Sequence, residues 1–220
     1  ASGIAGGDAS TTAQAVLDGD ENDNFFGVSV SSAGDIDGDG YSDLVIGADY
    51  DSNNGNNSGS AFIFLGSGSG IANGDASAVA HAVLTGDGAA DLFGVAVSSA
   101  GDINGDGYSD VVVGAYADDN NGSGSGSAFV FVGSASGIAG GAASSVAAAA
   151  LDGGGSGDFF GWSVSAAGDV NGDGYSDIVV GAYYDDNAGT NSGSATLYHG
   201  AASGLLSGNA TAVAHAVMNG

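Results

Sequence analysis

The chain lacks lysine and arginine altogether, whereas 26 of its 220 residues are aspartate or glutamate, so its formal net charge is −26. Nucleic-acid recognition and adsorption to anionic membranes both depend on basic side chains. The composition therefore predicts no nucleic-acid partner. Because no carboxylate can pair with lysine or arginine, the repulsion between carboxylates must be relieved by solvent, salt or bound cations. Two interpretations follow: an acidic surface suited to saline conditions, and a cation-binding protein.

Cysteine and proline are also absent, while glycine makes up 44 residues. The lack of cysteine excludes disulfides and thiolate metal sites. Abundant glycine without proline indicates many tight turns between short elements. No apolar run approaches the roughly 20 residues of a membrane span, so no membrane insertion is expected. The chain starts at Ala1 without a signal peptide, so we expect a processed protein or a segment of a longer one.

An internal repeat is the strongest feature of the sequence. The pair Phe-Gly at position 26 recurs at positions 93 and 160, always 67 residues apart. The segment GSAFIFLG, from Gly59, recurs as GSAFVFVG from Gly126 and as GSATLYHG from Gly193. The opening SGIAGGDASTTAQAVLDG matches the end of each unit, so a 19-residue tail of one unit precedes three full units.

Each unit is predicted to contain four strands, which in the first unit cover residues 26–35, 44–48, 61–66 and 81–86. The first strand alternates large and small residues. The second and third are continuous apolar runs, which is typical of strands buried on both faces. Before the fourth strand, the alanine-rich ASSVAAAALDG could be read as a helix. Its aligned copies favour a loop followed by a short strand.

The predicted fold class is all-β, built from four-stranded antiparallel blades of the β-propeller type. A single blade cannot bury both of its faces, so neighbouring blades must supply the core. Three blades are fewer than the usual minimum of about four, so closure within one chain is not predicted. The predicted division is an outer strand of a preceding or neighbouring blade at 1–19, and three repeats at 20–86, 87–153 and 154–220.

Every unit carries an acidic nine-residue loop, which reads DIDGDGYSD in the first unit. Side-chain oxygens stand at positions 1, 3, 5 and 9, and glycines at positions 4 and 6 permit a tight backbone. Calcium takes about 6 to 8 oxygen ligands, including a backbone carbonyl from position 7. The predicted ligands are Asp35, Asp37, Asp39, Tyr41 and Asp43; Asp102, Asn104, Asp106, Tyr108 and Asp110; and Asp169, Asn171, Asp173, Tyr175 and Asp177.

Other interpretations of these loops are weaker. Magnesium retains its waters, and zinc or copper would require histidine or cysteine, neither of which is near the loops in sequence. An EF-hand needs a glutamate at position 12, where this chain has Ile46, Val113 and Val180. A metal-free acidic turn is the remaining alternative. Three copies with the same ligand positions favour calcium, at about one ion per repeat.

The pattern FG…AGDxNGDGxxDxxxGA resembles the FG-GAP repeat, which occurs in the β-propeller of integrin α subunits and in bacterial surface proteins. The resemblance covers all three units. It implies that the acidic loop joins the first two strands of each blade, that the three loops share one edge, and that the protein is extracellular or at the cell surface. The proline of the family motif is replaced here by Asp49, Tyr116 and Tyr183.

No catalytic site is predicted. The chain has no G-x-S-x-G elbow, and phosphate loops of the Walker type need the lysine that is absent. His81 and His215 hold equivalent positions in two units, but Gln14 and Ala148 replace them in the others. We therefore expect a protein that is not an enzyme.

The sequence favours a calcium-binding extracellular structural or adhesion module that self-associates head to tail, or belongs to a larger repeat array or surface filament. The alternative is a ligand-binding propeller domain of a cell-surface receptor, recognising a protein or a glycan, or an accessory domain of a secreted hydrolase.

Overall fold

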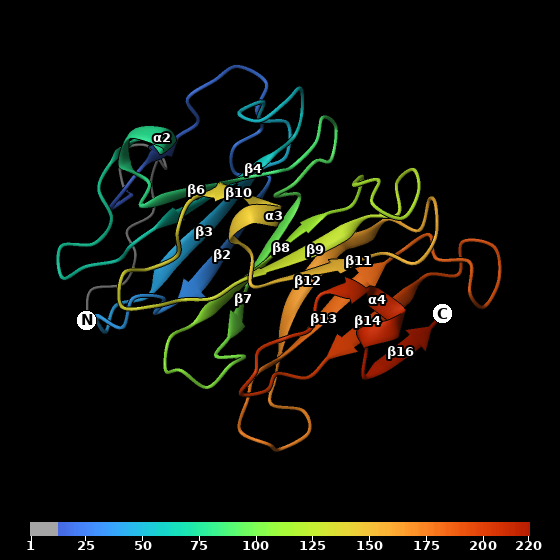
Figure 1. Ribbon diagram of the computed structural model, residues 1–220. Coiled ribbons are helices and arrows are strands. Elements are labelled where there is room, and N and C mark those ends of the chain that lie inside the picture. The colour runs from blue at the N-terminus through green and yellow to red at the C-terminus, as the bar shows by residue number, and fades with distance from the viewer. Residues whose placement is uncertain (1–12) are drawn as a thin grey trace.

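The computed structural model describes residues 13–220. Its three large sheets each contain four antiparallel strands, and we name these four-stranded units blades 1, 2 and 3 (Figure 1). Blade 1 contains β2 (Ser29–Gly34), β3 (Asp43–Ala48), β4 (Ser60–Phe64) and β6 (Ala82–Thr85). Blade 2 contains β7 (Ala96–Gly101), β8 (Asp110–Ala115), β9 (Ser127–Phe131) and β11 (Ala149–Asp152). Blade 3 contains β12 (Phe160–Gly168), β13 (Asp177–Ala182), β14 (Ser194–Tyr198) and β16 (Ala216–Asn219). The predicted all-β fold of propeller-type blades is confirmed, although the exact repeat boundaries remain a prediction.

The two middle strands of blades 1 and 2 are buried on both faces, as their continuous apolar runs predict. In blade 1 they pair antiparallel, with Val45 opposite Ile63. In blade 3 the same strands are only partly buried, because one face of that sheet has no neighbour among the described residues. Burial of the middle strands therefore depends on the adjacent blade.

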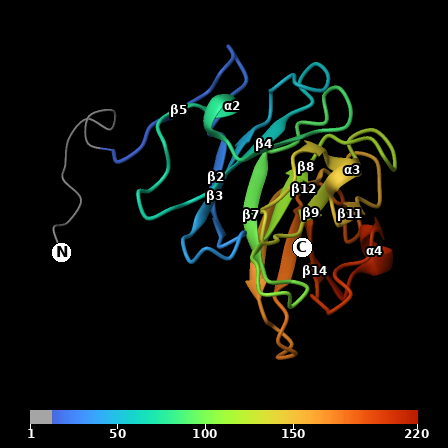
Figure 2. The same cartoon turned by 60° about the vertical axis from the view of Figure 1, so that its left-hand side comes forward.

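Adjacent blades share their apolar cores. One core combines Val45 and Ile63 of blade 1 with Phe93, Val113 and Phe129 of blade 2. A second core joins blades 2 and 3 in the same way. The innermost strand β7 contacts both β2 and β12, so the blades follow one another in chain order (Figures 1 and 2). Within residues 13–220 the sheets stay separate and do not close into a barrel, in line with the prediction.

A short parallel strand from the next repeat extends blades 1 and 2. Strand β10 (Gly141–Ala142) pairs with β6, and β15 (Gly208–Asn209) pairs with β11. In the same way, β5 (Gly74–Asp75) pairs with β1 (Leu17–Asp18). The predicted outer strand at residues 1–19 falls partly outside the described residues. In the part that is described, β1 takes the position that β6 and β11 hold in their blades.

One helical turn precedes each outer strand, at α2 (Ala76–Val79), α3 (Ala143–Val146) and α4 (Ala210–Val213). The expectation of a loop at ASSVAAAALDG is therefore wrong for its first half, while the strand that follows is correct. The turn forms because Ala143 is buried and its carbonyl accepts a hydrogen bond from the N–H of Ala147 at 2.9 Å. None of the helices in the described part of the chain has the length and hydropathy that spanning a bilayer requires.

Candidate metal centre

The three acidic loops connect the first and second strands of their blades, between β2 and β3, β7 and β8, and β12 and β13. They lie at the same edge of successive blades, as the resemblance implied (Figure 1). Each loop begins where an irregularity in strand pairing ends the first strand, such as the one between Ser32 and Gly34 in blade 1. The repeat therefore places three equivalent acidic turns side by side.

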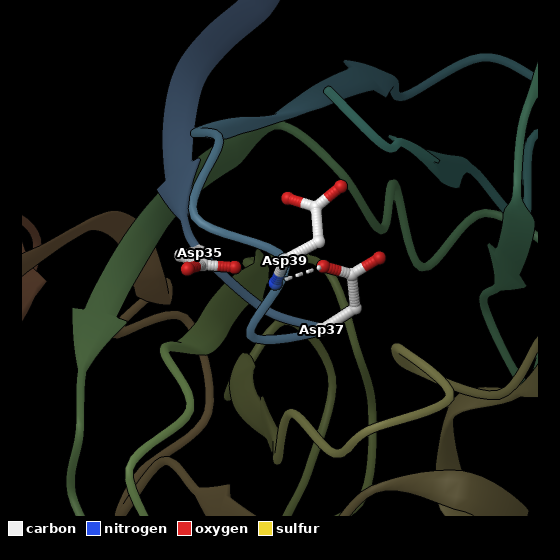
Figure 3. A group of neighbouring side chains, drawn as sticks. All are labelled: Asp35, Asp37 and Asp39. Atoms are coloured by element: carbon white, nitrogen blue, oxygen red, sulfur yellow. Dashed lines mark hydrogen bonds between the residues drawn. The ribbon is translucent and has the colours of Figure 1, made fainter. Parts of the chain in front are cut away.

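In the first loop, Asp35, Asp37 and Asp39 each offer a carboxylate oxygen, and these oxygens lie within 4.8 Å of one another (Figure 3). Three close carboxylates repel one another, and this chain has no lysine or arginine to neutralise them. An all-oxygen set of this kind suits a hard cation such as calcium. The donor set and its spacing therefore fit the predicted ion.

The aspartate at position 1 holds the loop in shape. The carboxylate of Asp35 accepts hydrogen bonds from the N–H groups of Gly38 at 2.8 Å and Gly40 at 2.9 Å. Asp102 and Asp169 make the equivalent bonds in their own loops. Gly38 and Gly40 have φ values of 76° and 90°, which favour glycine. The glycines at positions 4 and 6 are thus required by this backbone.

Positions 3 and 5 stay close together in all three loops. In the first loop, the N–H of Asp39 donates to the carboxylate of Asp37 at 3.0 Å. In the other two loops an asparagine at position 3 donates its side-chain amide to the aspartate at position 5, at 2.9 Å from Asn104 and 2.8 Å from Asn171. The residues at positions 3 and 5 are therefore held together by hydrogen bonds in each turn.

The aspartate at position 9 lies in a different environment. Asp43, Asp110 and Asp177 are fully buried. The two carboxylate oxygens of Asp43 accept hydrogen bonds from the N–H groups of Ile36 and Gly66, both at 2.7 Å. Burial raises the pKa of Asp43, and it raises the pKa of Asp110 to about 7, against the opposing effect of the backbone hydrogen bonds. This residue fastens the loop to the end of the third strand, and a ligand role for it remains a prediction.

The tyrosine at position 7 has a second role that the sequence did not reveal. A Cβ on Gly38 would lie 2.8 Å from Cε1 of Tyr108, and one on Gly105 would lie 2.6 Å from Cε1 of Tyr175. The ring of each of these tyrosines thus covers the acidic loop of the preceding blade. The carbonyl of Tyr41, Tyr108 and Tyr175 as a metal ligand remains a prediction.

No histidine is close to the loops in sequence, but the fold brings His199 beside the third loop in space. The side-chain amide of Asn171 lies 3.0 Å from Nδ1 of His199. His199 follows β14, whose last residue pairs with the start of β13, and this register brings it beside the loop. His199 also stacks on His215, with ring centroids 4.4 Å apart.

A second acidic region lies in the loops after β3, β8 and β13, at the opposite ends of these strands. Asp118 is only 4% exposed, and burial raises its pKa to about 6. The N–H of Asn120 donates to it at 2.8 Å and opposes the shift, while Asp91 and Asp152 add to it. Its equivalent Asp51 is buried, and one of its carboxylate oxygens has no hydrogen-bond partner among the residues that the structure describes. We identify no cation site in these loops.

The three units match the model of the FG-GAP repeat at residues 26–64, 93–131 and 160–198, together more than half of the chain. The chain belongs to the FG-GAP repeat family. This confirms the resemblance stated from the motif, and it makes the protein integrin-α-like.

Among curated proteins, the chain is similar in sequence to integrin α subunits. The chain is 31% identical to mouse integrin alpha-IIb over 168 residues, which cover 76% of this chain and 16% of that protein. It is 36% identical to human integrin alpha-6 over 56% of this chain and 10% of that protein, and 32% identical to Drosophila integrin alpha-PS2 over 74% and 12%. The chain thus spans less than a fifth of the length of these relatives.

Proposed function

We propose that this protein is a calcium-stabilised extracellular module that builds a surface structure or mediates adhesion, and that it is not an enzyme. The observation that carries the proposal is the cluster of three carboxylates in the first loop, on a backbone template that the other two loops repeat. The integrin relatives support a location outside the cell or on its surface.

The residues of this chain that would hold calcium are the oxygens at positions 1, 3 and 5, with the carbonyl at position 7 and the carboxylate at position 9. The bound ion would supply positive charge where no basic side chain is available, and three ions would reduce the formal charge from −26 to about −20. The buried aspartate at position 9 links each loop to the third strand, so a loop held in shape would stabilise its whole blade.

Isothermal titration with calcium chloride tests this function. We expect about three ions per chain, and we expect the melting temperature to rise with calcium and fall with a chelator, because only the folded chain assembles the sites. Magnesium at the same concentration is the control and should stabilise less. Heat signals and melting curves that do not change with calcium would contradict the proposal.

A ligand-binding role is the second candidate, and exposed aromatic side chains favour it. Trp162, Tyr183 and Tyr184 are 41%, 43% and 39% exposed, and they cluster with Phe159 and Tyr116 at the ends of strands away from the acidic loops. Rigid exposed aromatic groups are frequent anchors for protein or glycan ligands. Screening of the chain against glycan and protein panels, with Trp162→Ala as the control, tests this role. Binding that Trp162→Ala leaves intact would place the ligand elsewhere.

A further inference from the structure

The contact between blades 1 and 2 is repeated at equivalent atoms between blades 2 and 3. Several backbone hydrogen bonds cross both contacts at equivalent positions. In the first contact, the N–H groups of Ser109, Ser134 and Phe93 donate to the carbonyls of Asp35, Ile36 and Ser58 at 2.9, 3.0 and 3.0 Å. In the second, Ser176, Ala201 and Phe160 donate to Asp102, Ile103 and Ser125 at 2.9, 2.9 and 3.1 Å. One contact thus has an acceptor half on the earlier blade and a donor half on the later blade.

Blade 3 exposes the acceptor half of this contact. Val170 of blade 3 is the counterpart of Ile36 in blade 1 and Ile103 in blade 2, one repeat length apart. Val170 is 53% exposed, whereas Ile36 and Ile103 are 0% and 1% exposed. Met218 is 52% exposed, while the leucines at the equivalent positions in blades 1 and 2 are fully buried. Gly172 has open space where the ring of a following tyrosine covers the glycines of the first two loops. We call this surface the blade 3 face.

Blade 1 exposes the donor half, which we call the blade 1 face. Val30 is 67% exposed, whereas its counterpart Val97 is 8% exposed because it packs in the core between blades 1 and 2. Val30, Phe26 and Leu17 line a hollow of about 340 Å³ on this face. Tyr41, whose counterparts cover preceding loops, is 48% exposed. The apolar residues of this face therefore correspond to those of the buried contact between blades, but no partner covers them among residues 13–220.

We propose that the blade 3 face of one chain docks on the blade 1 face of a second copy, so that the contact between blades continues from chain to chain. The inference rests on the assembly role in the proposed function. The argument is continuity, because the two faces are the two halves of an interface that this chain already forms twice. A second copy supplies matching apolar residues and the backbone donors Ser42 and Ser67 at the same positions, while the N–H of Phe26 donates to the side chain of Asn24 within its own chain. A head-to-tail contact of this type closes into a ring or continues as a filament.

Docking requires an exchange of outer strands. In front of blade 1, β1 already holds the outer-strand position, where Leu17 packs against the core of that blade. In blade 3, β16 holds the same position. Leu17 matches the buried Leu84 and Leu151, whereas β16 has the longer, unbranched Met218. Strand β1 of the incoming copy therefore replaces β16 of the chain that it joins.

Light scattering on the full chain in calcium tests the inference. Because the chain has a mass of 20.6 kDa, we expect masses at multiples of this value that grow with protein concentration. A dimer would be a ring of six blades, which lies within the usual range of about 4 to 8, and larger multiples would be open filaments. A monomer at every concentration would overturn the inference.

Two variants each block one face. Val30→Lys puts a charge on the blade 1 face, and Ser163→Lys puts one on the blade 3 face, where Ser163 is exposed on β12. Each variant alone should be monomeric, but their mixture should form a capped dimer, because each retains the face that the other lacks. Leu206→Lys, at a residue that is 70% exposed and whose counterparts Ala72 and Ala139 are exposed too, is the matched control and should assemble like the unmodified chain.

These measurements separate the two proposals. A monomer that still binds three calcium ions would overturn the docking inference and leave the proposed calcium role standing. Assembly without calcium binding would overturn the proposed calcium role and leave the docking inference standing. Assembly of Val30→Lys to the same extent as the unmodified chain, with unchanged melting behaviour, would show that the blade 1 face is not used.

Discussion

The ring of Tyr108 lies over Gly38, a residue of the preceding acidic loop, so that a Cβ on Gly38 would come within 2.8 Å of the ring. The two residues belong to different blades, and their contact links the first candidate metal loop to the second. Tyr175 covers Gly105 in the same manner. Loop geometry and blade packing are therefore coupled in this fold.

The first prediction compares Gly38→Ala with Gly172→Ala. Both glycines have nearly the same φ, 76° and 77°, so both alanines carry a backbone cost of roughly 1–2 kcal/mol. Only Gly38 also faces a tyrosine ring, whereas Gly172 has open space. Gly38→Ala should therefore lower the free energy of unfolding more than Gly172→Ala in calcium-free denaturant titrations. Equal losses would mean that the ring of Tyr108 moves aside without cost.

A second prediction concerns calcium stoichiometry. Asp35→Asn keeps one of the two oxygens that accept backbone hydrogen bonds and removes one of three clustered charges, so the first loop should lose calcium affinity. Titration calorimetry should show one ion fewer per chain than in the unmodified protein. Asp75→Asn makes the same change of charge at an exposed site outside the loops and should keep the full stoichiometry. Loss of an ion in both variants would point to a nonspecific effect of charge.

A third prediction follows from the pKa of Asp118, which burial raises to about 6. Between about pH 4, the ordinary aspartate value, and pH 6 the folded chain holds a proton that the unfolded chain has released. Stability therefore falls as the pH rises through this window and stays lower above it. Asp118→Asn removes the charge. The melting temperature of the variant minus that of the unmodified chain should therefore increase from pH 4 to pH 6 and stay constant above pH 6. Melting curves at saturating calcium measure this, and a difference independent of pH would contradict it.

The fourth prediction concerns the core between blades. Phe93 is fully buried and contacts Phe129 and Phe131 at ring distances of 5.7 and 6.1 Å. Phe93→Ala should lower the free energy of unfolding by about 3–5 kcal/mol because it opens a cavity. Its counterpart Phe26 is only partly buried on the blade 1 face, so Phe26→Ala should cost less. Denaturant unfolding of both variants at equal low concentration checks the order.

Local features of the chain were readable from the sequence. The 67-residue period is visible when the units are compared. The strands around the acidic loops and the positions of Asp35, Asp37 and Asp39 depend on residues close together in the chain. The structure agrees with them because turn geometry and strand patterning act over a few residues. The helical turns α2, α3 and α4 are not predicted from the sequence, because four residues are too short to show a helical period.

Contacts between distant residues were decided only by the tertiary structure. The sequence does not show that Asp43 reaches the N–H of Gly66, that Asn171 meets His199, or that β10 adds a parallel strand to β6. Each contact depends on how strands and blades pack, since the residues involved are 23 or more positions apart in the chain. The sequence by itself determined the repeating unit and its acidic loop. Packing of one unit on the next decided which surfaces are buried, because each blade completes its core only against a neighbour.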